Sequence, residues 1–380
     1  MPETTLILCS SMPEALFYAR EAINRGERIV ASSSLAYDES AKLYPVWEFL
    51  PSVYEEQFPA ALQTLIARHH ITRIYCPNNF AHFTLLRLRE AGELQLPLIG
   101  MPPLLEQTEA TKRLMNEARE VAEFIKQWNG RDTLADFRIA TILRQAELTY
   151  GESHPSKLIA MMAIFADLPP GDVVEIGCFL GKTAVVLTML AQHFKIGAVL
   201  CVDPWSRQES VQKDSPALVR AMPGSDDWEM LFIGFIANVA AVAEAGRFNY
   251  LRQPSVEAEV IYRDKTPIAS AEFGSVPYSG RLALIHIDGN HDYASVKADY
   301  EAWRPHMQPG GWVVLDDYCW LHGDGPKRLG DEVLAAEKQN IAHSFVAGKA
   351  LFLQIAQDVP ALLQRDDEGR GEDHMAVRAN

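Results

Sequence analysis

Short apolar runs alternate with helix-length segments along the first hundred residues. Four apolar runs bounded by turn residues predict strands at 5–10, 28–33, 72–77 and 97–100. Two intervening segments, 13–25 and 57–69, carry apolar residues at three-and-four spacing and predict amphipathic helices. The pattern therefore predicts a small Rossmann-like α/β domain over residues 1–104.

A polar stretch with helical spacing follows, and we expect a helical connector over residues 105–150. From residue 151 the strand rhythm restarts, with apolar runs at 171–176, 198–203, 248–252, 282–288 and 312–317. Runs of this kind, separated by helix-length segments, predict a parallel, doubly wound sheet in a domain spanning 151–363. Residues 364–380 are charged with little apolar content, which predicts a disordered tail.

The chain has 380 residues, 48% of them hydrophobic, which is ample for packed cores. Its 35 basic and 50 acidic residues give a formal net charge of −15, which argues against binding to nucleic acid or an anionic membrane and favours a small-molecule partner. Five widely spaced cysteines without a Cys-x-x-Cys pair are typical of a reducing compartment. Because no run of about 18 apolar residues occurs, we expect a cytoplasmic protein.

A glycine-containing turn lies between a predicted strand and a predicted helix. Gly177 and Gly181 enclose three residues before Lys182, one fewer than a phosphate-binding P-loop requires, so an NTPase is the less favoured alternative. The dinucleotide pattern is also absent because Phe179 stands at its second glycine. What remains, Glu175-x-Gly-x-x-x-Gly, resembles the first motif of class I S-adenosylmethionine-dependent methyltransferases. The resemblance implies that the glycines let the backbone approach the cofactor closely and that Glu175 attracts the cofactor's cationic amino group. The alternative is a tight turn that binds no ligand.

A second acidic residue stands at the end of the next predicted strand. Asp203 lies 22 residues after Gly181, close to the roughly 20 expected for a carboxylate that accepts hydrogen bonds from ribose hydroxyls. Trp205 and Ser255 lie on following turns. Two interpretations stay open for them: they flank the adenine ring, or they are a packing tryptophan and a helix cap.

Three aspartates stand at the ends of two later strands. Asp288 ends one run, within which His286 is predicted to be a buried core histidine, and Asp316 and Asp317 end the next. Because the carboxyl ends of parallel strands share one edge, we expect the three carboxylates to converge. Converging carboxylates repel one another unless a cation lies among them, and oxygen ligands favour Mg²⁺. Aspartates that cap loops without any ion are the alternative.

Residues 287–293 and 309–318 resemble the metal-dependent O-methyltransferases that include macrocin-type sugar O-methyltransferases and cephalosporin-hydroxylase-like proteins. The resemblance extends over about residues 150–350. It implies that Mg²⁺ is held by Asp288, Asp316 and Asp317 and that His291 is the general base; a histidine that only orients an aspartate is the alternative. Asn290 departs from the family's usual Asp-Gly-Asp-His and changes the charge of that loop.

We therefore predict an α/β protein whose C-terminal domain has the Rossmann-like class I methyltransferase fold. Its predicted reaction is the Mg²⁺-dependent transfer of a methyl group from S-adenosylmethionine to a hydroxyl of a small metabolite, such as a sugar or a polyphenol-like ring. Related enzymes often assemble, so a homo-oligomer is expected. The alternative is a non-catalytic assembly protein that retains the fold.

The N-terminal domain carries fewer signals. Residues 98–103 and 109–115 faintly resemble the entry into an ATP-grasp enzyme, but the body of such an enzyme does not follow. The strand-end residues of this domain either line a site of unknown ligand or form ordinary turns: Ser10, Ser11, Asn78 and Asn79.

Overall fold

The computed structural model describes residues 3–357, so the predicted tail 364–380 lies outside the described residues. The chain divides into two compact units, with the boundary between Asn116 and Glu117. This boundary falls within the long helix α4, Pro103–Asn129. The next helix, α5, Asp136–Leu148, packs against helix α7 of the second unit. Most of the expected connector therefore consists of α4 and α5.

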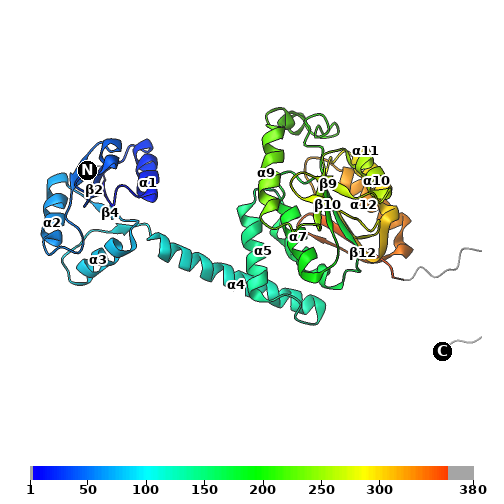
Figure 1. Cartoon of the computed structure of the whole chain (residues 1–380), viewed down its shortest axis with the longest axis horizontal. Coiled ribbons are helices and arrows are strands. Elements are labelled where there is room, and N and C mark those ends of the chain that lie inside the picture. The colour runs from blue at the N-terminus through cyan, green and yellow to red at the C-terminus, as the bar shows by residue number, and fades with distance from the viewer. Residues whose placement is uncertain (1–2, 358–380) are drawn as a thin grey trace, which may run out of the picture. The chain divides into compact units, whose positions relative to one another are not determined.

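The first unit is a five-stranded parallel sheet with the order β3-β2-β1-β4-β5. Its strands are β1 Thr4–Leu8, β2 Arg28–Ser33, β3 Trp47–Phe49, β4 Arg73–Tyr75 and β5 Leu98–Ile99. Its helices are α1 Pro13–Asn24, α2 Phe58–His69 and α3 Asn79–Glu90, with a 3-10 turn η1 at Glu39–Leu43. The alanines of α1 belong to one core cluster and the apolar residues of α2 and α3 to another, so the helices cover opposite faces of the sheet (Figure 1).

The strand-end residues of the first unit serve the local structure. The Asn78 side chain accepts a hydrogen bond from the Ala81 amide at 3.0 Å and caps α3. The Ser10 hydroxyl accepts a hydrogen bond from Trp47 Nε1 at 3.1 Å and lies 3.2 Å from the Ser40 hydroxyl. A ligand for this edge of the sheet stays a prediction.

The second unit is built on a seven-stranded sheet with the order β13-β14-β12-β11-β6-β7-β8. Its strands are β6 Asp172–Ile176, β7 Val199–Val202, β8 Phe248–Leu251, β11 Leu282–Ile287, β12 Met307–Leu315, β13 Ile341–Ala347 and β14 Ala350–Ile355. A separate two-stranded ribbon consists of β9 Ile268–Ser270 and β10 Gly274–Val276. Its helices beyond α5 are α6 Pro155–Ile164, α7 Lys182–Phe194, α8 Ala217–Ala221, α9 Trp228–Ala240, α10 Ser255–Arg263, α11 Tyr293–Trp303 and α12 Gly325–Ala336. Short 3-10 turns lie at Phe165–Asp167, Met222–Gly224, Arg304–His306 and Lys338–Asn340.

The five strands predicted for this sheet are present and parallel to one another. The predicted sheet was incomplete, however, because β14 pairs antiparallel with both β12 and β13. Gly348 and Lys349 join the two extra strands with φ of 54° and 74°, the left-handed conformation that a tight hairpin turn requires. The edge strand β13 is partly exposed, and His343 and Ser344 interrupt its apolar residues, so its sequence lacks the continuous apolar run that marked the buried strands.

Helices cover both faces of the large sheet. The core of one face includes buried residues of α10, α11 and α12, while α5, α6 and α9 pack with α7 on the other (Figure 1). Both β6 and β11 are buried along their whole length, as expected for central strands of a covered parallel sheet. Between residues 3 and 357, no helix combines the length and apolar character needed to cross a membrane.

Candidate active site

The order of the strands defines where a ligand would bind in the large sheet. From β6 the chain moves outward through β7 and β8, and it then returns to the other side of β6 with β11 and β12. Ligands of open α/β sheets bind at the carboxyl ends of the strands where this reversal occurs. The glycine turn follows β6, and Asp288 and Asp316 follow β11 and β12, so the topology brings the two predicted groups to one edge.

The turn after β6, residues 177–181, is called the glycine loop below. Gly177 and Gly181 have φ of 79° and 88°, in the left-handed region that favours glycine. A Cβ atom on Gly177 would overlap the carbonyl group of Asp288. The glycine loop is therefore in direct contact with the loop that carries the first aspartate.

Asp203 holds the glycine loop in place. Its carboxylate accepts hydrogen bonds from the backbone N–H groups of Cys178 at 2.8 Å, Phe179 at 3.0 Å and Trp205 at 2.7 Å. Burial raises the pKa of Asp203, and the three N–H donors oppose that rise. A carboxylate offers about four acceptor positions, so one is left for the ribose hydroxyl predicted from the sequence.

Trp205 and Ser255 occupy framework positions near these turns. Trp205 is 2% exposed, packs with its ring centroid 4.7 Å from that of Phe235, and donates from Nε1 to the Phe179 carbonyl at 2.9 Å. The Ser255 hydroxyl accepts a hydrogen bond from Trp303 Nε1 at 2.9 Å. The contacts of Trp205 match the packing interpretation. The helix-cap interpretation of Ser255 is wrong, because α10 begins at Ser255 itself with Pro254 at its N-cap and without a side-chain cap hydrogen bond. A contact of either residue with adenine stays a prediction.

Glu175 is buried below the glycine loop rather than displayed on it. It pairs in register with His286 on the neighbouring strand, and His286 Nδ1 lies 3.1 Å from Glu175 Oε1. His286 is fully buried, as the sequence predicted for a core histidine. Burial and the charge of Lys157 lower the pKa of His286, but Asp316 and Glu175 outweigh them and raise it to about 9. The predicted contact of Glu175 with the amino group of a cofactor stays untested.

The carboxylate cluster consists of Asp288, Asp316 and Asp317. The backbone N–H groups of Asp288 and Asp316 donate to Ile176 and Ile287 at 2.8 and 2.9 Å, so both residues continue the sheet before the chain turns away. Asp317 has a φ of 50°, a strained conformation for a residue with a side chain. Ligand atoms of Asp288 come within 4.8 Å of those of both Asp316 and Asp317.

Lys157, a lysine on α6 that the sequence patterns did not indicate, reaches into the cluster. Its Nζ contacts Asp316 Oδ2 and lies 3.5 Å from Asp288 Oδ2 and 3.4 Å from His286 Nε2. Burial lowers the pKa of Lys157, but Asp288 and Asp316 outweigh it, so the ammonium stays charged. The available signal was a lone lysine within an otherwise apolar helix.

His291 lies on the outer side of the cluster. Its Nε2 atom is buried without a hydrogen-bond partner, 3.6 Å from Asp288 Oδ1 and 3.7 Å from Asp317 Oδ2. Its Nδ1 atom lies 3.3 Å from Gln212 Nε2, and the Trp320 ring packs edge-on at 4.8 Å. Burial lowers the pKa of His291, but the carboxylate of Asp288 outweighs it and raises the pKa.

The residues beside His291 hold the segment between β7 and α8 over this part of the site. Both carboxylate oxygens of Asp292 accept backbone hydrogen bonds, from Lys213 at 2.7 Å and Asp214 at 2.8 Å. The Asn290 side chain donates to the carbonyls of Glu209 and Val211, each at 3.0 Å. Asn290 therefore serves as a donor, which the aspartate of the familiar loop cannot do.

The chemistry of these residues fits a divalent ion. Three carboxylates converge here and a single lysine ammonium, that of Lys157, contacts them, so acidic groups outnumber the lysine in the cluster. The unpartnered Nε2 of His291 faces two carboxylate oxygens at more than hydrogen-bond distance. Hard oxygen ligands of this kind suit Mg²⁺.

A family profile described as a methyltransferase domain matches residues 174–318. The match runs from β6 to just beyond β12 and includes the glycine loop and the carboxylate cluster. The matched region lies within the part of the second unit for which the motifs predicted a Rossmann-like methyltransferase domain.

One curated protein is similar to part of this chain. The 8-demethyl-8-(2,3-dimethoxy-alpha-L-rhamnosyl)-tetracenomycin-C 4'-O-methyltransferase of Streptomyces olivaceus is 29% identical over 163 residues, 41% of this chain and 56% of that protein. The chain thus matches about half the length of this curated relative. Two solved structures are weakly similar. The O-methyltransferase NovP has a TM-score of 0.39 and 19% identity over 53% of this chain and 79% of its own. The calicheamicin methyltransferase CalS11 has a TM-score of 0.37 and 16% identity over 67% of this chain and 94% of its own.

Proposed function

We propose that this protein is an S-adenosylmethionine-dependent O-methyltransferase that acts on a hydroxyl of a small, sugar-bearing natural product. The observation that carries the proposal is the direct contact of the glycine loop, the proposed cofactor-binding turn, with Asp288. Asp288 in turn lies 3.6 Å from His291, the candidate base. The methyltransferase-domain match supports the reaction class. The Streptomyces olivaceus relative, whose name describes methylation of a rhamnosyl group, supports a sugar hydroxyl as the acceptor.

Methyl transfer is an in-line displacement at the methyl carbon of a sulfonium. The acceptor oxygen forms the new C–O bond while the C–S bond breaks and its electron pair stays on sulfur, which becomes a neutral thioether. The acceptor proton must leave, and the unpartnered Nε2 of His291 is the atom placed to take it. Asp288 and Asp317 flank that atom and stabilise the imidazolium that forms.

The acceptor also needs orientation, because displacement requires the oxygen, carbon and sulfur to lie in line. Asp288 and Asp317 would hold Mg²⁺, while Asp316, paired with Lys157, lies behind them. The ion would bind vicinal hydroxyls and lower the pKa of the reacting one. Asn290 and Asp292 anchor the segment between β7 and α8 beside the loop that carries His291.

Calorimetric titration with S-adenosylmethionine and with S-adenosylhomocysteine tests the first half of the proposal. Binding of both is expected, and it should be unchanged in Asp264→Asn, a control at an exposed residue of the second unit. If neither molecule binds, the proposed function is wrong.

Transfer of a labelled methyl group to a panel of rhamnosides, with Mg²⁺ or with chelator, tests the second half. Asp288→Asn should abolish transfer and leave cofactor binding in place. If the wild-type protein binds cofactor but methylates no acceptor in the panel, the proposed acceptor class is wrong, and the non-catalytic alternative gains support.

The assembly state of the full chain is a separate part of the same proposal. We expect a homo-oligomer, and light scattering of the full chain measures it directly. A monomeric mass would contradict this part without affecting the proposed reaction.

A further inference from the structure

Lys157 is an unusual residue for its position. It is fully buried on α6, most of whose other residues are buried and apolar. Burial of an unpaired ammonium costs several kcal/mol, so a lysine is kept in such a place only where opposite charges meet it. The carboxylates of Asp288 and Asp316 do so.

The backbone around Lys157 is fixed as well as its side chain. His154 caps α6 by accepting a hydrogen bond from the Ser156 amide at 3.2 Å. The tight turn between β13 and β14 packs on the same end, and a Cβ atom on Gly348 would lie 2.6 Å from the backbone nitrogen of Lys157. The ammonium is therefore positioned by the fold and does not depend on a bound ligand.

The contacts of Lys157 divide the oxygens of the carboxylate cluster into two sets. On the inner side, Lys157 lies against Asp316 Oδ2 and 3.5 Å from Asp288 Oδ2. The other oxygen of Asp316 accepts the Asp317 amide at 2.9 Å. On the outer side, Asp288 Oδ1 and Asp317 Oδ2 face the unpartnered Nε2 of His291.

We propose that Lys157 is the resident cation of the cluster: it occupies the inner oxygens and leaves the outer oxygens as the place for one exchangeable divalent ion. In this arrangement the ammonium does the work that a second metal ion would do, because it neutralises Asp316 and orients Asp288. Lys157 is thus a positioning residue. This inference rests on the divalent ion of the proposed function, but not on methyl transfer itself.

Binding of Mn²⁺, counted from the electron paramagnetic resonance signal of the free ion, tests the proposal without any measure of activity. Wild-type protein should bind one Mn²⁺ per chain at the cluster, and Mg²⁺ should displace it. Lys157→Met keeps the volume of the side chain and removes its charge. Because loss of a neighbouring positive charge strengthens the attraction of the carboxylates for a cation, the variant should bind Mn²⁺ about tenfold more tightly or better.

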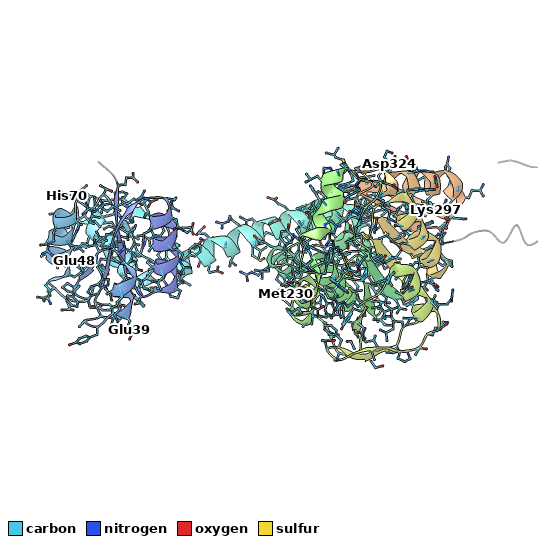
Figure 2. All side chains as sticks on the ribbon, turned by 90° about the horizontal axis from the view of Figure 1, so that it is seen from above. Glu39, Glu48, His70, Met230, Lys297 and Asp324 are labelled. Carbon is cyan, nitrogen blue, oxygen red and sulfur yellow. The ribbon has the colours of Figure 1, made fainter. Side chains whose placement is uncertain are left out.

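Lys297→Met is the matched control. Lys297 lies on α11 (Figure 2). It is partly exposed and forms an ion pair with Glu332 at 3.7 Å. Its removal should leave Mn²⁺ affinity within twofold of wild type. An affinity in Lys157→Met that is unchanged or lower would overturn the proposal, as would two bound Mn²⁺ per wild-type chain.

A second measurement on the wild-type protein covers the case in which Lys157→Met does not fold. Chelator-treated protein is acetylated briefly, and the modified lysines are identified by mass spectrometry. Lys157 should be modified less than one tenth as much as the exposed Lys327, with or without Mn²⁺. Protection that appears only after Mn²⁺ is added would mean that Lys157 is not resident in the cluster.

The outcomes separate this inference from the proposed function. If Mn²⁺ binds as expected but S-adenosylmethionine does not bind, the proposed methyltransferase activity is wrong and the proposed role of Lys157 is retained. Cofactor binding with no Mn²⁺ bound to the wild-type chain would overturn the role of Lys157 and the metal, but not methyl transfer.

Discussion

Asp299 offers a direct test of the electrostatics of the second unit. Its side chain lies on α11, is 8% exposed and interacts with the hydroxyl of Ser255. Trp303 Nε1 donates to the same hydroxyl at 2.9 Å, which leaves the Ser255 hydrogen free to point toward Asp299. Burial raises the pKa of Asp299 to about 6, because a single hydroxyl replaces little of the lost hydration.

The sign and size of the effect follow from linkage. An unfolded aspartate titrates near pH 3.9, so the folded protein holds this proton more tightly and loses stability as pH rises from about 4 through about 6. A shift of roughly two pKa units corresponds to about 3 kcal/mol. Asp299→Asn removes the charge, keeps the shape and retains an acceptor for Ser255. The variant should therefore be more stable than wild type by about 2–3 kcal/mol at pH 8, with the difference shrinking toward zero near pH 4.

Urea unfolding followed by circular dichroism at pH 8, 6 and 4.5 measures this difference. Asp264→Asn, at an exposed position, should change stability by no more than about 0.5 kcal/mol at any of these values. If Asp299→Asn raises the free energy of unfolding equally at every pH, or if the variant is less stable than wild type at pH 8, the buried charge of Asp299 is not the cause of the stability difference.

Three further perturbations test the site. Asp203→Asn sets an amide N–H₂ group against backbone N–H donors, so we expect a loss of about 1–3 kcal/mol in urea unfolding and weaker cofactor binding in calorimetry. His291→Gln should reduce methyl transfer by roughly 10²–10⁴-fold while the cofactor Kd stays within threefold; a loss of binding instead would assign the residue a structural role. Gly177→Ala would overlap the Asp288 carbonyl and should lower the melting temperature far more than Gly246→Ala, which has a similar φ of 77° but open space around it.

The sequence alone determined four of the five strands of the small sheet, the five parallel strands of the large sheet and the turns at their ends. It missed the short strand β3 and the apolar, buried strand β14. Strands buried on both faces are largely apolar, so β6 and β11 were visible without any structure. The glycines of the loop were equally visible, because a left-handed turn in close contact with another backbone accepts little else. The convergence of Asp288 with Asp316 and Asp317 also followed, since parallel strands end at a shared edge.

Only the tertiary structure decided which charges meet. Lys157 lies more than one hundred residues before the aspartates that it pairs with, and no local pattern links a helix residue to a strand end so far away. Trp205 and Asp203 carry the residue types of a cofactor site, yet their contacts with the glycine loop depend on how the turns after β6 and β7 pack together. Local patterns arise from the periodicity of the backbone, whereas the balance of charge in a buried cluster depends on every element that surrounds it.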